Sequence, residues 1–168
     1  MDSNRETKQI IDRQGGIRRA CYLVAKYREQ EMNEALSKYL KDKMMADLAT
    51  VEGLQPRVRP ITLMYYRESF WIATGKSDAK SRQIEQNPLV EAVYILKGEQ
   101  NTGYIRISGS LAQISDLPTR KDLADWSGFI YEYFDSPENP DLAIYQLVPS
   151  SIRLMNPGDM YETEMLQE

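Results

Sequence analysis

The central part of the chain alternates short hydrophobic runs with turn residues, and this pattern predicts a protein built mainly of β-strands. Gly53 and Pro56 mark the first turn, and residues 67–69 form a tight connection. The expected strands are 44–51, 57–66, 70–74, 89–96, 103–115 and 142–155. Six antiparallel strands in one domain close best as a small barrel, because closure leaves little sheet edge unpaired. We therefore predict a mainly β, α+β fold: a six-stranded antiparallel barrel with flanking helices.

Two residues are unusual inside the longer predicted strands. Gly109 predicts either a β-bulge or a close approach of another backbone. Pro149 predicts a break in the last strand. A barrel of this size is filled by its own side chains. A ligand must therefore bind outside it, on the barrel wall or between subunits.

Helical spacing of hydrophobic residues is found near the N-terminus and in two short segments of the β region. After a break at Gly15-Gly16, the N-terminal spacing predicts two helices or one long bent helix. Its apolar positions are 17, 20, 21, 24, 27, 32, 35, 36, 39 and 40. The short helices are expected at 80–86, ending at Asn87 before a proline, and at 118–126.

The length of 168 residues predicts one main domain. We divide the chain into an N-terminal helical extension at 1–40, the barrel domain at 41–158 and an acidic tail at 159–168. We expect this tail to be loose, because it follows an Asn-Pro-Gly sequence at the end of the last predicted strand.

Basic residues gather between the second predicted strand and the first short helix. Arg57 and Arg59 are two apart in a strand, so they share a face, which we expect to be the outward one. Ser77 and Lys80 lie at a helix start, where free backbone N–H groups favour an anion. These groups either converge on one phosphate, or Ser77 only caps the helix and the basic residues are solvated. The residues alone leave both interpretations open.

Composition narrows the possible functions. The chain has 21 basic and 25 acidic residues and a net charge of −4, which argues against nucleic-acid binding. It has no histidine, which excludes a histidine-ligated metal, a Ser–His or Cys–His nucleophile and a histidine haem ligand. Cys21 is the only cysteine, so an intrachain disulfide is impossible. No apolar run has the length of a membrane span, and the polar start lacks a signal-peptide core. We expect a cytoplasmic protein without metal, membrane or nucleic-acid partners.

Four segments occur in a characteristic order: PRVRPI at 56–61, FWIATGKSDAK at 70–80, QIEQNPLV at 83–90 and YIRISGSL at 104–111. Together they resemble the pyridoxamine 5′-phosphate oxidase-like family of flavin-binding split barrels. The resemblance extends over roughly residues 40–155. It implies a Greek-key split barrel that holds flavin mononucleotide (FMN) at a homodimer interface.

The resemblance also implies which residues bind the cofactor. The strand at 57–62 would line the flavin, while Thr74 and Lys80 would reach its ribityl-phosphate. The implied cofactor-binding residues are Arg57, Val58, Arg59, Pro60, Thr62, Thr74, Lys76, Ser77, Lys80 and Tyr104. One departure matters, because the true oxidases carry Ser-Arg-Lys where this chain has Asp78-Ala79-Lys80. A phosphate-binding arginine is therefore missing, and Lys76 and Arg82 are candidates to replace it.

The function implied by the resemblance is an FMN-dependent oxidoreductase that acts on an unknown small molecule. No residue stands out as a catalytic acid or base. The chain lacks the Arg-Leu-x-Pro-like C-terminal motif of the true oxidases, so pyridoxal phosphate synthesis is not expected. The segment DSPENPDLAIYQL at 135–147 instead resembles the general-stress-protein branch.

Two alternatives stay open. One is a non-catalytic flavin-binding or sensing dimer, and the other is a deazaflavin-dependent reductase of the same fold. Four aromatic residues would either cover the flavin from the partner subunit or belong to the ordinary core: Trp126, Tyr131, Tyr133 and Phe134.

Overall fold

The computed structural model describes residues 34–167. The chain divides into two units, Met1–Lys38 and Tyr39–Glu168. In the first unit, residues 34–37 are helical, in agreement with the spacing at 32–40. The helix predicted at 17–27 lies outside the described residues. No helix within 34–167 is long and apolar enough to cross a membrane.

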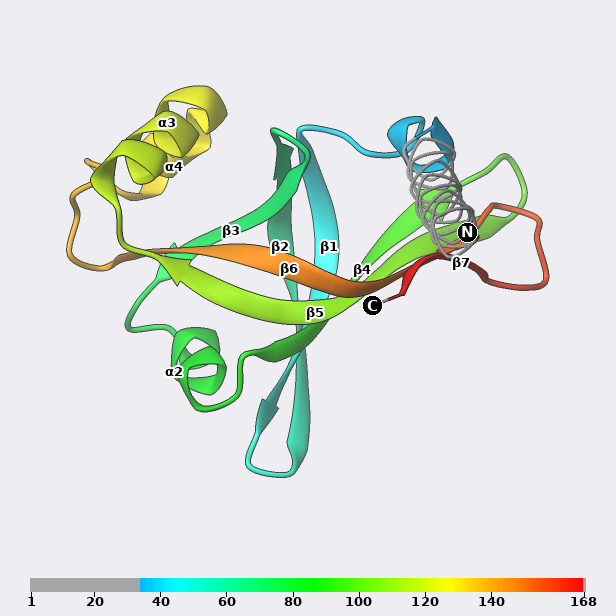
Figure 1. Cartoon of the computed structure of the whole chain (residues 1–168), viewed down its shortest axis with the longest axis horizontal. Helices are drawn as coiled ribbons and strands as arrows, with labels where there is room; N and C mark the ends of the chain where they lie inside the picture. Colours follow the sequence, from blue (N-terminus) through cyan, green and yellow to red (C-terminus); the bar gives the residue numbers. More distant parts are fainter. Residues whose placement is uncertain (1–33, 168) are drawn as a thin grey trace, which may run out of the picture. The chain divides into compact units, whose positions relative to one another are not determined.

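The second unit is an antiparallel barrel, as predicted (Figure 1). Its strands are β1 (Lys43–Glu52), β2 (Gln55–Tyr66), β3 (Ser69–Gly75), β4 (Leu89–Lys97), β5 (Thr102–Ile114), β6 (Leu142–Met155) and β7 (Thr163–Gln167). They are ordered β3-β2-β1-β4-β5-β6-β7, and a further pairing of β3 with β6 closes the first six into a barrel. The six predicted strands are therefore confirmed, with ends that differ by one or two residues.

The seventh strand corrects the prediction for the C-terminus. We expected residues 159–168 to be loose, but β7 pairs with β6, with Ile152 opposite Leu166. The paired segment TEMLQ is too short and polar for its pattern to predict a strand. Its place is set by the free edge of β6 and by ion pairs of the preceding Glu162 with Arg106 and Arg153.

Gly109 allows the backbones of β5 and β6 to approach closely where their register shifts. A Cβ atom at this glycine would overlap the carbonyl oxygen of Val148, so the backbone approach is close. The register shifts here, because Ser108 pairs with Ser151 and Gly109 pairs with Pro149. The predicted bulge is thus confirmed. The predicted break at Pro149 is wrong, because β6 continues through the proline and accommodates it in the bulge.

Side chains fill the barrel, as expected for this size. Leu48, Leu63 and Ile105 are fully buried in its interior. A second apolar cluster lies where α3 (Leu117–Ser127) and α4 (Phe129–Tyr133) pack with residues of β2, β3 and β6. Its buried members are Met64, Trp71, Leu123, Ala124, Ile130, Leu142 and Ile144. Trp126 packs against this cluster and stacks on Tyr66 at 4.5 Å between ring centroids, so it belongs to the ordinary core.

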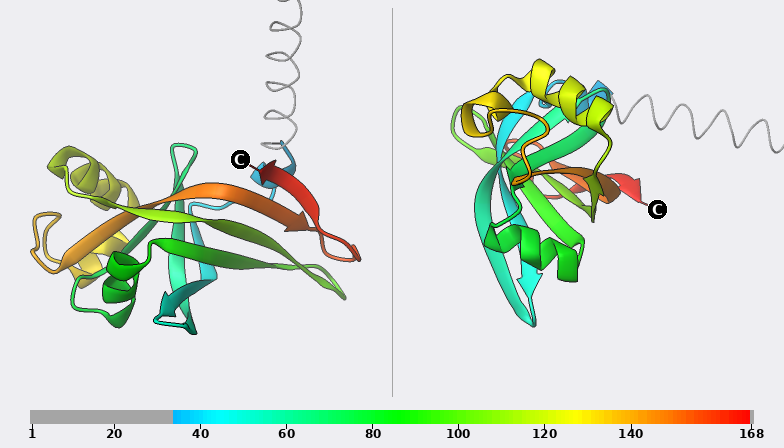
Figure 2. Two further views of the ribbon diagram at one scale, coloured as in Figure 1. Left: turned by 60° about the horizontal axis from the view of Figure 1, so that its bottom comes forward. Right: turned by 90° about the vertical axis from the view of Figure 1, so that its left-hand side faces the viewer.

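The remaining helix, α2 (Ala79–Gln86), begins after Asp78 and ends at Asn87, as predicted. It lies on a different side of the barrel from the α3–α4 pair (Figure 2). Ser81, Gln83 and Ile84 are its buried residues. The turn before α2 follows directly after the end of β3. Its polar groups therefore lie at the barrel wall.

Candidate functional site

A cavity of about 260 Å³ lies between the outer side of β2 and β3, the helix α4 and the turn before α2. Its walls combine apolar and polar groups, and the polar ones come from β2, from the end of β3, from the turn and from the start of α2. The lining residues are Pro60, Ile61, Thr62, Ala73, Thr74, Gly75, Asp78, Lys80, Phe129, Tyr133 and Phe134. The barrel interior is packed, and the cavity lies outside it. We expected a ligand to bind outside the interior.

The polar end of the cavity is built around the carboxylate of Asp78. Thr74 Oγ1 and Lys80 Nζ each donate to Asp78 Oδ2 over 2.6 Å. These two hydrogen bonds hold the pKa of the Asp78 carboxyl below its ordinary value, so it is ionised at neutral pH. Lys80 is the one cationic residue among the described residues that line this cavity.

A second carboxylate, that of Asp141, holds the turn itself. The backbone N–H of Ser77 donates to Asp141 Oδ1 over 3.1 Å, and that of Lys76 donates to the Asp141 carbonyl. Ser77 does not cap α2, because the residue at the N-cap position is Asp78. The interpretation that Ser77 caps the helix is therefore wrong, and its N–H is bound by an internal anion.

The two arginines of β2 share a face, as predicted, but it is not the outward one. Arg59 has the same strand parity as the buried Ile61. Its guanidinium donates to Thr50 Oγ1 over 2.6 Å and to Gln83 Oε1 over 2.8 Å. Arg57 forms an exposed ion pair with Glu52 at 2.6 Å. The expected outward orientation is wrong, since alternation along β2 turns Pro60 and Thr62, not the arginines, toward the cavity.

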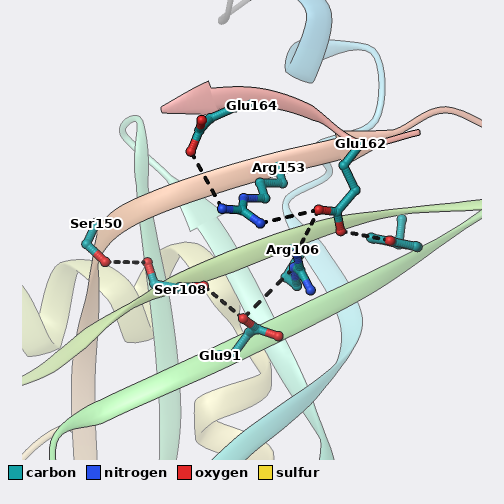
Figure 3. Close-up of polar contacts among 8 residues, drawn as sticks. Glu91, Arg106, Ser108, Ser150, Arg153, Glu162 and Glu164 are labelled. Carbon is teal, nitrogen blue, oxygen red and sulfur yellow. Dashed lines mark hydrogen bonds and ion pairs between the residues drawn. The ribbon is translucent and has the colours of Figure 1, made fainter. Parts of the chain in front are cut away.

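The structure brings four of the ten predicted cofactor-binding residues into the cavity wall: Pro60, Thr62, Thr74 and Lys80. The others lie elsewhere in this chain. Val58 is 67% exposed on β2, and Lys76 faces a different cavity. Tyr104 donates to Glu162 over 2.8 Å. Glu162 belongs to a polar cluster of residues on β4, β5, β6, β7 and the segment before β7 (Figure 3).

That other cavity, of about 320 Å³, lies near the start of α3 and the loop at 138–140. Its most buried charge is Arg120, which is 8% exposed. The Arg120 guanidinium donates to the carbonyl oxygens of Pro137, Asn139 and Leu142. These bonds fix the loop that enters β6, so the role of Arg120 is structural. Arg82, considered as a replacement for the missing phosphate-binding arginine, donates to the Ser77 carbonyl instead.

Sequence reasoning missed Phe129 as a wall residue and missed the pairing of Asp78 with Thr74 and Lys80. For Tyr133 and Phe134 the sequence left open a flavin cover from the partner subunit and an ordinary core position, and in the structure they line the cavity of their own chain. The signal for Asp78 was present, because an acidic residue stood next to the predicted phosphate site. The spacing Thr74 to Asp78 to Lys80 crosses a turn, however, and no strand or helix periodicity relates such positions.

Residues 32–156 match the family described as pyridoxamine 5′-phosphate oxidase. The chain belongs to this family. General stress protein 26 of Bacillus subtilis, which is 30% identical over 135 residues, matches 78% of this chain and 93% of its own length.

Solved structures of the pyridoxamine 5′-phosphate oxidase-like type share the fold. A NimC/NimA family protein from Clostridium acetobutylicum has a TM-score of 0.66 and 23% identity, covering 81% of this chain and 92% of its own. A FAD-binding protein from Mesorhizobium loti has a TM-score of 0.57 and 18% identity, covering 70% of this chain and 87% of its own. Members of the family commonly bind a flavin.

Proposed function

We propose that this chain binds FMN in the cavity between β2, β3 and α4, and that it acts as an FMN-dependent oxidoreductase on a small molecule. The observation that carries the proposal is the convergence of Pro60, Thr62, Thr74 and Lys80 on one cavity. These residues come from two strands and a helix start, and the family pattern assigned all four to the cofactor.

The chemistry of the cavity suits the parts of the cofactor. Ala73, Phe129 and Phe134 offer an apolar wall for a flat ring system. Thr62 and Thr74 offer hydroxyl groups that can hydrogen-bond the ribityl chain, and Lys80 offers a cation for the terminal phosphate. When bound, the flavin supplies the electron-transfer chemistry, while the protein positions it and excludes water.

One chain supplies only part of such a site. Cavities that bind a cofactor measure roughly 300–1,000 Å³ and enclose most of the ligand, whereas this one measures about 260 Å³. Thr62 lies opposite Met45 in the sheet, and Met45 is 69% exposed on β1. Val58 and Ile95 are exposed on β2 and β4. This apolar outer face continues from the cavity and supports a homodimer in which a second copy completes the flavin site.

The proposal is tested by purifying the full chain and recording its visible absorbance. A yellow protein that releases FMN on denaturation, and that light scattering shows as a dimer, is the expected result. Colourless protein that also fails to bind added FMN would refute the flavin site. Anaerobic reduction by NAD(P)H and reoxidation by candidate acceptors then separates an oxidoreductase from a non-catalytic flavin-binding dimer.

Lys80→Ala tests where the phosphate binds. A charge-assisted hydrogen bond to a phosphate contributes about 2 kcal/mol, so FMN affinity should fall about thirtyfold. Riboflavin has no phosphate, and its affinity should change less than about twofold. Equal losses for both ligands would mean that Lys80 maintains the shape of the turn instead of contacting the phosphate.

A further inference from the structure

Two of the donors that line this cavity, Thr74 Oγ1 and Lys80 Nζ, are already bound to a carboxylate of the chain. Thr74 Oγ1 and Lys80 Nζ both donate to Asp78 Oδ2, and the Ser77 N–H donates to Asp141 Oδ1. Phosphate-binding sites require such donors to be free for the ligand. The polar end of this cavity is therefore a site that an internal anion occupies.

The Asp78 carboxylate is available to Thr74 and Lys80 because its side chain does not cap α2. An aspartate at the N-cap position ordinarily accepts a hydrogen bond from an N–H in the first turn of the helix. Asp78 has an extended backbone, with φ −62° and ψ 147°, and makes no side-chain capping bond. Its carboxylate is directed instead to two residues that line the cavity, Thr74 and Lys80.

The charges around this end come from every element that meets there. Lys80 on α2 contributes one positive charge, and Asp78 cancels it at 2.6 Å. From the loop before β6, Asp141 Oδ2 lies 3.0 Å from the position that a Cβ atom would take on Gly75, and Asp78 Cγ lies 3.7 Å from the same point. Tyr133 on α4 is neutral and lines the cavity. A phosphate dianion that reaches Lys80 would meet the Asp78 carboxylate in the same cavity wall, with the Asp141 carboxylate nearby at Gly75.

We propose that Asp78 sets the selectivity of this cavity between phosphorylated and unphosphorylated flavins, by competing with the phosphate for Thr74 and Lys80. The inference rests on the proposed flavin site and concerns only its phosphate end. The Lys80 ammonium has three N–H donors, so a phosphate can share it with Asp78, but the bond to Asp78 competes with the bond to the phosphate. The advantage of FMN over riboflavin is therefore smaller than the same donors would give without Asp78.

The experiment measures dissociation constants of FMN and riboflavin by quenching of flavin fluorescence, with the full chain. Asp78→Asn removes the charge and keeps the shape. Asp78→Ser is a second variant that also shortens the side chain, in case the amide disturbs the turn. Glu85→Gln is the matched control, since it removes one exposed carboxylate from the same helix outside the cavity wall.

Both Asp78 variants should bind FMN more tightly, on the order of tenfold, because a carboxylate no longer competes with the phosphate for Lys80 and Thr74. Their riboflavin affinity, and both affinities of Glu85→Gln, should match wild type within about twofold. Combining Asp78→Asn with Lys80→Ala should abolish most of the gain, since the competition acts through Lys80.

Other outcomes separate this inference from the proposed function. If wild type binds FMN and the Asp78 variants bind it no more tightly, Asp78 does not compete and only this inference is overturned. If FMN and riboflavin gain equally, Asp78 affects access to the cavity and not the phosphate, which also overturns it. If neither wild type nor the variants bind any flavin, the proposed function fails and the inference fails with it.

Discussion

Arg59 and Arg57 provide a matched test of the structure, because they share one face of β2 but have different surroundings. Arg59 donates to Thr50 Oγ1, Gln83 Oε1 and the Leu48 carbonyl. Thr50 and Gln83 are 1% and 4% exposed. Arg57 contacts only the exposed Glu52 carboxylate among the described residues. We expect Arg59→Ala to destabilise the barrel clearly and Arg57→Ala to leave it almost unchanged.

The magnitude follows from the bonds that each change removes. Hydrogen bonds from a charged donor contribute about 1.5–3 kcal/mol each, but Arg59 is only half-buried and its bond to Leu48 is long, at 3.3 Å. Thr50 Oγ1 also donates to Gln83 Oε1 over 2.6 Å, so neither group is left without a partner when Arg59 is removed. The expected loss is therefore about 2 kcal/mol for Arg59→Ala. An exposed ion pair contributes about 0–1 kcal/mol, which bounds the effect of Arg57→Ala.

Urea unfolding followed by circular dichroism measures both effects. A lower midpoint at an unchanged slope is expected for Arg59→Ala, because a loss of stability alone leaves the exposed area on unfolding the same. The stability of Arg59→Lys should lie between those of wild type and Arg59→Ala, since lysine keeps the charge but cannot donate hydrogen bonds from a planar fork. A loss as large for Arg57→Ala as for Arg59→Ala would refute the reasoning. So would an Arg59→Ala variant that retains full stability and loses only FMN affinity, because that result would restore the phosphate role predicted from the sequence.

Three further predictions concern other parts of the barrel. Hydrogen bonding to Tyr104 and the nearby Arg106 lower the pKa of Glu162, so its anion stabilises the fold. In urea titrations, Glu162→Gln should be less stable than wild type by the full amount above pH 4.5, the ordinary glutamate pKa, and this difference should vanish as the pH falls through the lowered pKa of Glu162. A difference in stability that persists in strong acid would contradict this. Gly109→Ala should cost about 3 kcal/mol in thermal unfolding, since the new Cβ overlaps a backbone carbonyl, whereas Gly53→Ala, with open space but a positive φ, should cost about 1 kcal/mol; equal costs would exclude the close approach. The buried Tyr145 hydroxyl has no hydrogen-bond partner in the described residues. Tyr145→Phe should therefore be as stable as wild type, or more stable by up to about 1 kcal/mol. A loss of stability would instead indicate a hydrogen bond to the neighbouring Ser81.

The fold could be predicted from the sequence because its strands are separated by clear turn residues and carry period-two patterns. Gly109 was informative for a steric reason, since glycine is the one residue that allows the approach of Val148. Two features could not be predicted. The strand β7 depends on the edge of β6 and on the ion pairs of Glu162, which are tertiary contacts. Pro149 was overestimated as a strand breaker, because the bulge opposite Gly109 removes the hydrogen bond that proline cannot make.

The candidate site was predictable only in part. Residues on the wall could be assigned from the family pattern, and Pro60, Thr62 and Thr74 do line the cavity. The arginines could not be placed, because period-two alternation states that Arg57 and Arg59 share a face without stating which face is inside. That choice is made by the buried Ile61 and Leu63 further along β2. Ile61 and Leu63 share the parity of the arginines, but the buried Met64 has the opposite parity, so the pattern of β2 alone does not decide the face.

The proposed phosphate end of the cavity illustrates why a list of donors does not determine affinity for an anion. Thr74 and Lys80 are donors of the right kind, yet each already donates to Asp78 over 2.6 Å in the folded chain. Under the proposed function, binding of a phosphate exchanges one set of charge-assisted bonds for another, and the net free energy is the difference between them. An acceptor inside the site can change this difference as much as the loss of a donor can. In this chain the residues that differ from the family pattern are adjacent, because Ala79 removes a donor and Asp78 adds an acceptor. Both changes act in the same direction, and only the second can be reversed by removing a single charge.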